Sequence, residues 1–357
     1  MTDNQSICGV CENRQITKPS ILWCFNCEEQ LCEDCKEHHS ISKGTKNHKT
    51  VSIDEYKKLP TEVTKNAMVS TKQNEKYEVF CRKYDFQRRK DEQAQISVPY
   101  PTKSIDNLTV TLHKRINTRL SMVRGCSLLP DGRMVFSCYA QNKLRVVRSD
   151  GFKDFEINNI GCMFDVIFIG NNCAAVTSGK SYRINIINTK NKQVKKTIEV
   201  NPQNDGVAYK NGHLIYCAEK KGLQVISLKN LSVTNIINKE LPTRAYVAAF
   251  SDQLFYTNRE NHSVTCCDYH GNILWMFCNT TVLSHPLGIS VDNDGNVFVV
   301  GFGSSNVVVI SSDGQRYRQI LSHEDGLFRP QVLHYDQSNK KLLVANRAND
   351  AFLFRVK

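Results

Sequence analysis

The sequence of 357 residues lacks any long hydrophobic run. No stretch approaches the roughly 18 consecutive apolar residues that a membrane-spanning helix requires, so we expect no membrane partner. The opening segment, MTDNQSICGVCENRQ, is polar throughout and has no apolar core of a secretory signal. We therefore expect a cytoplasmic protein whose thiols stay reduced.

Catalytic motifs are also missing from the sequence. Neither a Gly-x-Ser-x-Gly nucleophile elbow nor a Gly-x4-Gly-Lys-Ser/Thr phosphate loop occurs, and Gly301 and Gly303 only mark a predicted turn. The histidines of the C-terminal part are expected in or beside turns, without metal-ligand spacing: His213, His262, His270, His285, His323 and His334. We therefore expect a protein that is not an enzyme.

Acidic residues are outnumbered, since 47 Lys and Arg against 35 Asp and Glu give a net charge of +12. Residues 121–240 hold 17 basic and 9 acidic side chains, a net +8, whereas residues 241–357 hold 10 of each. A one-sided basic surface is what phosphate-backbone binding uses, so RNA binding through residues 118–240 is one alternative, and ordinary solvation is the other. The basic side chains concerned are Arg145, Arg148, Lys153, Lys180, Arg183, Lys190, Lys192, Lys195 and Lys196. Stacking aromatics among them are few, with Tyr182 and Tyr209 as candidates.

Cysteine, by contrast, is abundant and unevenly placed. Of 15 Cys, six form three Cys-x2-Cys pairs within the first 35 residues: Cys8 and Cys11, Cys24 and Cys27, Cys32 and Cys35. His38, His39 and His48 follow. A two-residue gap lets one turn aim both thiolates at one ion, and these residues supply enough ligands for two tetrahedral zinc ions. Small buried thiols or disulfides are the alternatives, but the regular pairing and the expected reducing compartment favour zinc.

The order C-x2-C-x12-C-x2-C-x4-C-x2-C-x3-H-x8-H resembles the B-box zinc finger of the tripartite-motif (TRIM) proteins. The resemblance implies a cross-brace with two zinc ions. One ion would be bound by Cys8, Cys11, Cys32 and Cys35, and the other by Cys24, Cys27, His39 and His48. His38 is an alternative to His39, which the three-residue gap of the family favours. We expect residues 1–53 to form this finger, with a short strand at 21–27 whose Trp23 and Phe25 cover the zinc core.

The middle of the chain departs from the TRIM pattern. TRIM ligases carry a RING finger before the B-box, and only seven residues precede Cys8; a RING would also show a Cys-x-His pair where Cys24 and Cys27 stand. Segment 70–85 resembles the start of a second B-box, but Ser70, Gln73 and Tyr84 occupy ligand positions and only Cys81 remains. We expect residues 54–105 to be a linker with a degenerate, metal-free finger. Because no apolar heptads persist over 55–105, the dimeric state of the family is left open.

From residue 118 the chain repeats. Short apolar runs align on Met134, Ala174, Leu214, Leu254, Val297 and Leu342. Their spacings of about 40 to 45 residues, with Asn-Gly or Asp-Gly turns between runs, are typical of propeller blades. Six such units predict a six-bladed β-propeller over residues 106–357, and the extra run at 108–116 is expected to supply the outermost strand of the last blade. Residues 285–314 resemble the NHL repeat found at the C-terminus of some TRIM proteins.

We therefore expect a mainly β protein, a small cross-brace zinc finger followed by a six-bladed propeller. The TRIM resemblance implies an adaptor that binds protein partners through its B-box and its propeller loops, in regulation linked to ubiquitin. Two alternatives remain, an RNA-binding propeller and a component of a ubiquitin ligase that uses the B-box in place of a RING.

Overall fold

The computed structural model describes residues 7–12, 16–24, 29–42, 50–54, 105–201 and 203–357. The chain divides into two compact units, Met1–Val98 and Pro99–Lys357. The predicted linker and degenerate second finger, including Cys81, fall at 55–104, outside the described residues. The predicted domain limits at 53, 54 and 105 stay predictions.

The first unit is a small sheet with two short helices. Its elements are α1 (Gly9–Glu12), β1 (Leu22–Cys24), β2 (Glu29–Leu31), α2 (Glu33–Ile41) and β3 (Thr50–Ser52). The strands are antiparallel in the order β2-β1-β3, with Leu22 opposite Leu31 and Ser52. The predicted strand at 21–27 is confirmed for Leu22–Cys24, and Phe25 lies outside the described residues. So small a sheet buries too little apolar surface to be stable alone.

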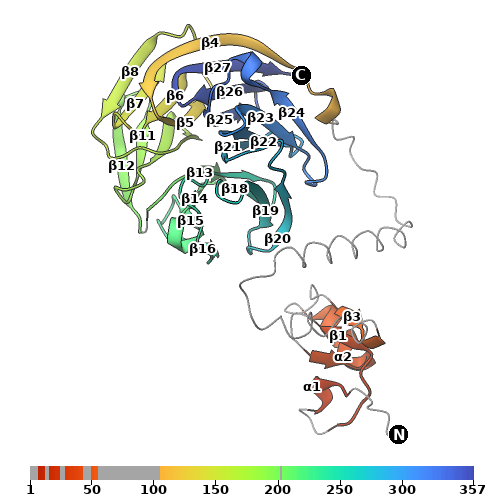
Figure 1. Cartoon of the computed structure of the whole chain (residues 1–357). Coiled ribbons are helices and arrows are strands. Elements are labelled where there is room, and N and C mark those ends of the chain that lie inside the picture. Colours follow the sequence, from red (N-terminus) through yellow and green to blue (C-terminus); the bar gives the residue numbers. More distant parts are fainter. Residues whose placement is uncertain (1–6, 13–15, 25–28, 43–49, 55–104, 202) are drawn as a thin grey trace. The chain divides into compact units, whose positions relative to one another are not determined.

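The second unit contains six four-stranded antiparallel sheets in its described residues (Figure 1). We call each sheet a blade. Blade 1 consists of β5 (Val123–Leu128), β6 (Met134–Cys138), β7 (Lys143–Val147) and β8 (Lys153–Asn158). Blade 2 consists of β9 (Val166–Gly170), β10 (Cys173–Thr177), β11 (Arg183–Asn188) and β12 (Gln193–Glu199). Blade 3 consists of β13 (Val207–Lys210), β14 (His213–Cys217), β15 (Leu223–Ser227) and β16 (Val233–Ile237), with the 3₁₀ turn η3 (Glu219–Lys221).

The remaining three blades follow the same pattern. Blade 4 consists of β17 (Val247–Phe250), β18 (Gln253–Asn258), β19 (Ser263–Asp268) and β20 (Ile273–Cys278). Blade 5 consists of β21 (Pro286–Val291), β22 (Val297–Gly301), β23 (Asn306–Ile310) and β24 (Tyr317–Leu321), followed by η4 (His323–Asp325). Blade 6 consists of β25 (Pro330–Asp336), β26 (Lys341–Asn346), β27 (Ala348–Val356) and β4 (Val110–Ser121), which η2 (Ile105–Asn107) precedes.

The blades form a closed ring around the first strand of each blade. Each of these strands contacts the first strands of both neighbouring blades, and β25 contacts β5. Apolar cores lie between successive blades, such as Leu144 and Val146 of blade 1 with Ala174 and Val176 of blade 2. The fourth strands are largely exposed, as in β12, because they form the perimeter of the ring. The predicted propeller-like, mainly β fold is confirmed.

The sequence repeats match the second strand of every blade. Met134, Ala174, Leu214, Leu254, Val297 and Leu342 all lie there and are fully buried. The predicted turns form as well: Asn211 and Gly212 join β13 to β14 with φ of 47° and 79°. A different constraint acts at Gly206, which precedes β13, because a Cβ there would lie 2.4 Å from the Cα of Tyr246 in the next blade. Glycine is therefore required where the first strands approach most closely.

The ring closes through β4, as the sequence predicts for segment 108–116. β4 pairs with β27 over Val110–Ser121, so residues near the start of the unit complete the blade that ends the chain. Arg318 of blade 5 anchors the approach to this strand: its Nη1 donates to the carbonyl oxygens of Asp106 at 2.9 Å and Leu108 at 2.8 Å. This pairing covers the edge of β27 and gives blade 6 the same number of strands as the other five blades.

The closing strand gives a stability prediction. Ile116 of β4 is 1 % exposed within the main core, so Ile116→Ala should lower the free energy of unfolding of the second unit by about 2–5 kcal/mol. Thr111→Ala, at an exposed position of the same strand, should change it by less than about 0.5 kcal/mol. Urea denaturation of both variants measures the difference; equal effects would show that β4 does not contribute its buried face to the ring.

Candidate functional site

Four cysteines converge in the first unit. Cys8 immediately precedes α1 and Cys11 lies within it, while Cys32 caps the N-terminus of α2 and Cys35 lies in its first turn. The four Sγ atoms lie within 4.8 Å of one another, and Cys11 Sγ is 3.6 Å from the Sγ of both Cys32 and Cys35. The structure therefore unites the first and third Cys-x2-Cys pairs of the sequence.

The donor set fits a structural zinc ion. Four sulfurs around zinc at about 2.3 Å lie about 3.8 Å apart in a tetrahedron, close to the separations at Cys11. The distances are too long for disulfide bonds, which place the sulfurs about 2.0 Å apart. Burial, and then hydrogen bonds from neighbouring thiols, raise the pKa of Cys35, so this thiol needs a bound cation to be stable as a thiolate. These four residues are a zinc-binding site.

The backbone of this unit holds the four thiols in place. Cys8 N–H donates to the carbonyl oxygen of Lys18 at 2.9 Å, and Lys36 N–H donates to the carbonyl oxygen of Cys32 at 2.9 Å. Lys18 also pairs with Asp34 in the first turn of α2. The segment that follows α1 is thereby joined to α2, which brings the two cysteine pairs together.

Part of the second predicted ligand set also comes together. Cys24, fully buried at the end of β1, has its Sγ 3.2 Å from Nε2 of His39 on α2. His38 is exposed on the same helix. Cys27 and His48 lie outside the described residues, so the count of two zinc ions stays a prediction.

The scattered cysteines of the second unit behave as packing residues. Cys126, Cys138, Cys173, Cys217, Cys266 and Cys267 are buried, Cys162 is half-buried and Cys278 is exposed. Cys266 and Cys267 belong to different core clusters, which follows from the alternation of side chains along β19. Burial raises the pKa of both thiols to about 12, so neither is a reactive thiolate at neutral pH.

Two buried aspartates lie at the starts of first strands, and the sequence reasoning missed them. Asp165 accepts the N–H of Val166 at 2.8 Å and that of Val207 in blade 3 at 3.0 Å. Asp205 accepts the N–H of Arg244 at 2.6 Å. Each carboxylate thus links neighbouring blades. Burial raises the pKa of Asp165 to about 7 and that of Asp205 to about 6. In the sequence, the signal that could have identified these two residues is an acidic residue just before an apolar run.

The histidines differ from the sequence expectation at two points. His334 does not lie in or beside a turn but within β25, and its Nδ1 accepts the N–H of Leu128 at 3.3 Å. His262 and His285 come from separate blades yet pack edge to face, with ring centroids 4.4 Å apart. His262 Nδ1 accepts the N–H of His285 at 3.0 Å, so this pair orders a connection between blades.

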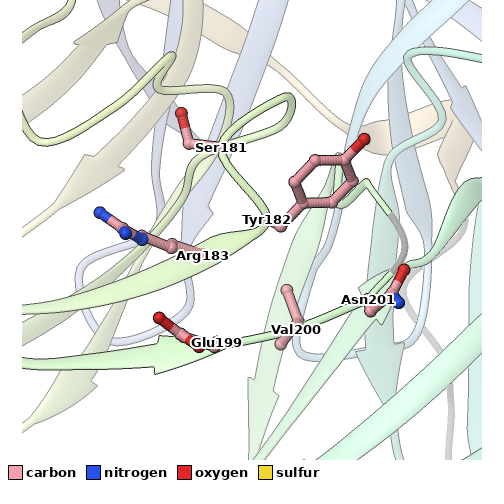
Figure 2. A pocket seen from close by; sticks show the side chains of 6 residues that line it. All are labelled: Ser181, Tyr182, Arg183, Glu199, Val200 and Asn201. Atoms are coloured by element: carbon pink, nitrogen blue, oxygen red, sulfur yellow. The ribbon is translucent and has the colours of Figure 1, made fainter.

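The basic side chains of blades 1 and 2 are partly paired. Arg145 pairs with Glu156, Arg148 with Asp150 and Lys192 with Asp154. Others are exposed on the outer strand β12, among them Lys195 and Lys196. A hollow of about 350 Å³ lies beside β11 and β12, and Figure 2 shows the side chains that line it, Ser181, Tyr182, Arg183, Glu199, Val200 and Asn201. It is shallow, and both charged residues of its lining are exposed.

Zinc should hold the first unit together without affecting the second. The chain has two tryptophans, Trp23 on β1 and Trp275 on β20, so Trp275→Phe leaves one fluorescent reporter in the first unit. We expect a strong chelator to unfold residues 8–50 and shift the Trp23 emission to the red. The thermal transition of the propeller should stay in place. Circular dichroism and fluorescence measure the two responses.

Two cysteine variants control that experiment. Cys32→Ser should show the red-shifted emission before any chelator is added, whereas Cys278→Ser, at an exposed thiol of the second unit, should behave as the parent protein. An emission spectrum that a chelator leaves unchanged would contradict a structural role for the metal.

Asp165 should make propeller stability depend on pH. Its folded pKa of about 7 lies above the unfolded value of about 3.9, so the folded state binds the proton more tightly. The contribution of Asp165 to the free energy of unfolding is greatest below about pH 4 and is lost as the pH rises to about 7. Asp165→Asn cannot titrate. Its stability relative to the parent protein should therefore increase between about pH 5 and about pH 8 in urea denaturation. A constant difference would refute the raised pKa.

No helix in the described parts of the chain has the length and apolar character needed to cross a membrane.

Comparison with known proteins supports both units separately. Residues 7–50 match the family described as ANCHR-like B-box zinc-binding domain, so the N-terminal unit is a B-box zinc-binding domain. No curated protein matches the sequence.

Solved structures share the fold of the second unit. A protein of unknown function from Bacteroides thetaiotaomicron is similar with a TM-score of 0.60 and 13 % identity, over 70 % of this chain and 76 % of that one. Virginiamycin B lyase from Staphylococcus aureus has a TM-score of 0.51 and 14 % identity, over 70 % and 99 %. A gluconolactonase from Xanthomonas campestris has a TM-score of 0.56 and 12 % identity, over 68 % and 88 %. At such identities these likenesses show a propeller-like fold and nothing of activity.

Proposed function

We propose that the chain is a non-enzymatic, zinc-binding adaptor of the tripartite-motif type. The observation that carries this proposal is the four-cysteine cluster within a matched B-box, in the same chain as a rigid propeller-like ring. Zinc fingers and propellers both present fixed surfaces for partner recognition. By resemblance to TRIM proteins, the adaptor binds two zinc ions, carries an NHL-like propeller and acts in the cytoplasm in ubiquitin-linked regulation, where another protein supplies the RING.

One serine–histidine pair bears on the non-enzymatic part of the proposal. Ser284 Oγ lies 3.0 Å from Nδ1 of His285, the beginning of a nucleophile–base pair. Burial and the neighbouring His262 and Arg259 lower the pKa of His285, and no carboxylate contacts its ring among the described residues. A serine–histidine pair without an acid to orient it lacks the third member of a hydrolase triad.

RNA binding is the second candidate, because exposed Lys195 and Lys196 extend along the outer strand of blade 2. The ion pairs of Arg145, Arg148 and Lys192 weigh against it, since they neutralise part of the basic surface that the sequence predicts.

Affinity capture with the full chain, with and without ribonuclease, tests the adaptor proposal. We expect protein partners that survive ribonuclease treatment and persist in the triple variant Lys192→Glu, Lys195→Glu, Lys196→Glu. Partners lost in both conditions would favour the RNA-binding alternative. In a reconstituted ubiquitin reaction the chain alone should be inactive; activity that disappears with Cys24→Ala would instead identify a ligase component.

A further inference from the structure

Five arginines gather at one end of the propeller ring. Arg124, Arg244 and Arg329 lie at or before the starts of first strands, while Arg259 and Arg347 follow the ends of second strands. First and second strands are antiparallel in every blade, so these positions share one edge of the ring. Backbone bonds confirm it: Arg347 N–H donates to the carbonyl oxygen of Arg329 at 3.1 Å. We call these residues the arginine cluster.

Arg124 is the buried member of the cluster. It is 4 % exposed, and its Nε and Nη1 have no hydrogen-bond partner among the described residues. Its guanidinium lies over the rings of Tyr139 and Phe164, 5.8 and 5.9 Å from their centroids. The Oη of Tyr246 in blade 4 donates to the carbonyl oxygen of Arg124 in blade 1 at 2.6 Å. This hydrogen bond joins two blades that are not neighbours in the ring. A buried guanidinium without an ion-pair partner is energetically unfavourable, and negative charge bound nearby would stabilise it.

The other arginines surround this buried charge. Arg347 lies beside it, because Val123 N–H donates to the Arg347 carbonyl oxygen at 3.2 Å. The positive charges of Arg244 and Arg347, after burial, lower the pKa of Arg124. Burial, and then the charge of Arg244, lower the pKa of Arg259, whereas Glu260 raises it; the buried Nε of Arg259 lacks a partner among the described residues. Arg244 and Arg347 therefore act electrostatically on Arg124, and Arg244 also acts on Arg259.

Aromatic rings fix the orientation of two guanidiniums. Arg259 and Arg329 both lie over the ring of Phe302, at 5.8 and 5.9 Å from its centroid. Stacking of this kind holds the guanidinium plane and leaves its N–H groups free at the edge.

No member of the cluster forms an ion pair with any residue that the structure describes. The arginines paired in the second unit are others, Arg115, Arg133, Arg145, Arg148 and Arg316. Asp205 lies near Arg124, but its carboxylate accepts the backbone N–H of Arg244 instead. Asp205 and Glu260 therefore offset part of the positive charge at this end, but neither forms an ion pair with a member of the cluster.

We propose that the arginine cluster binds an acidic peptide segment of a protein partner, whose carboxylates pair with the exposed Arg244 and Arg347 beside the buried charge of Arg124. The proposal rests on the adaptor function and specifies its partner. An arginine guanidinium can donate two parallel hydrogen bonds to a single carboxylate. Arg244, Arg329 and Arg347 are exposed, so the ligand is reached at the surface. Hollows beside Tyr182 and beside Leu108 are lined by other residues and include no member of the cluster.

A peptide suits the cluster better than a nucleic acid. Single-stranded RNA is bound by free aromatic faces on which bases stack. Here the rings of Tyr139 and Phe302 already carry guanidiniums.

Fluorescence anisotropy on the zinc-loaded full chain tests the proposal. The probe is a short labelled peptide with a Glu-Gly-Glu centre, and its partner probe carries Gln-Gly-Gln. We expect only the Glu peptide to bind, and binding to weaken at least about tenfold in Arg244→Glu and in Arg347→Glu, because opposed charges become like charges. Arg355→Glu, an equal charge change at an exposed position of β27, should leave binding unchanged. Arg124→Met, which removes the buried charge and keeps an apolar stem, should weaken binding while the melting temperature holds.

Several results would overturn the inference. The inference fails if the Glu peptide does not bind or if the Gln peptide binds equally well. It also fails if Arg355→Glu weakens peptide binding as much as Arg244→Glu does, or if poly(U) RNA binds and requires the same arginines. Capture experiments separate this failure from failure of the adaptor function: if protein partners are still recovered with Arg244→Glu and Arg347→Glu combined, the adaptor function stands and the acidic-peptide site falls.

Discussion

The pairing of β4 with β27 is the interaction on which the second unit depends. It joins residues 110–121 to residues 348–356 and makes the blades a ring rather than an open array. Once the ring is closed, blade 6 lies against blade 1, which places Arg347 beside Arg124. A chain without this pairing would expose the edge of blade 6 and separate the two arginines. Closure thus supplies both the stability of the ring and the geometry of its charged end.

The first unit solves the same problem of stability by a different means. Its described sheet has three strands of three residues each, and its buried core consists mainly of cysteine. Hydrophobic burial cannot stabilise so small a unit, whereas a zinc ion bound by four thiolates can contribute most of its folding free energy. The two units therefore respond to different conditions, one to metal supply and the other to pH through its buried carboxylates.

Much of this architecture could be predicted because it is encoded locally. The gaps between Cys8 and Cys11 and between Cys32 and Cys35 specify ligand pairs, and the recurring apolar runs specify second strands. The arginine cluster could not be found this way. Four of its members lie in residues 241–357, the half whose acidic and basic side chains balance. The net charge of a sequence segment does not show which acidic side chains form ion pairs with other residues. The charge sums therefore placed the expected basic surface on blades 1 to 3. Asp165 was missed, and His334 was expected at a turn rather than in a strand, because burial follows from the ring and not from neighbouring residues.

We propose that this protein recognises partners through fixed surfaces on two independently stabilised units. Hydrogen exchange measured on the full chain, free and bound to a protein recovered by capture, tests it most directly. The account predicts slowed exchange in α2 of the B-box, in the amides around Arg124, Arg244 and Arg347, or in both, with the outer strands of the blades unchanged. Protection confined to the outer strand β12, with none in the B-box or at the arginine end, would contradict it.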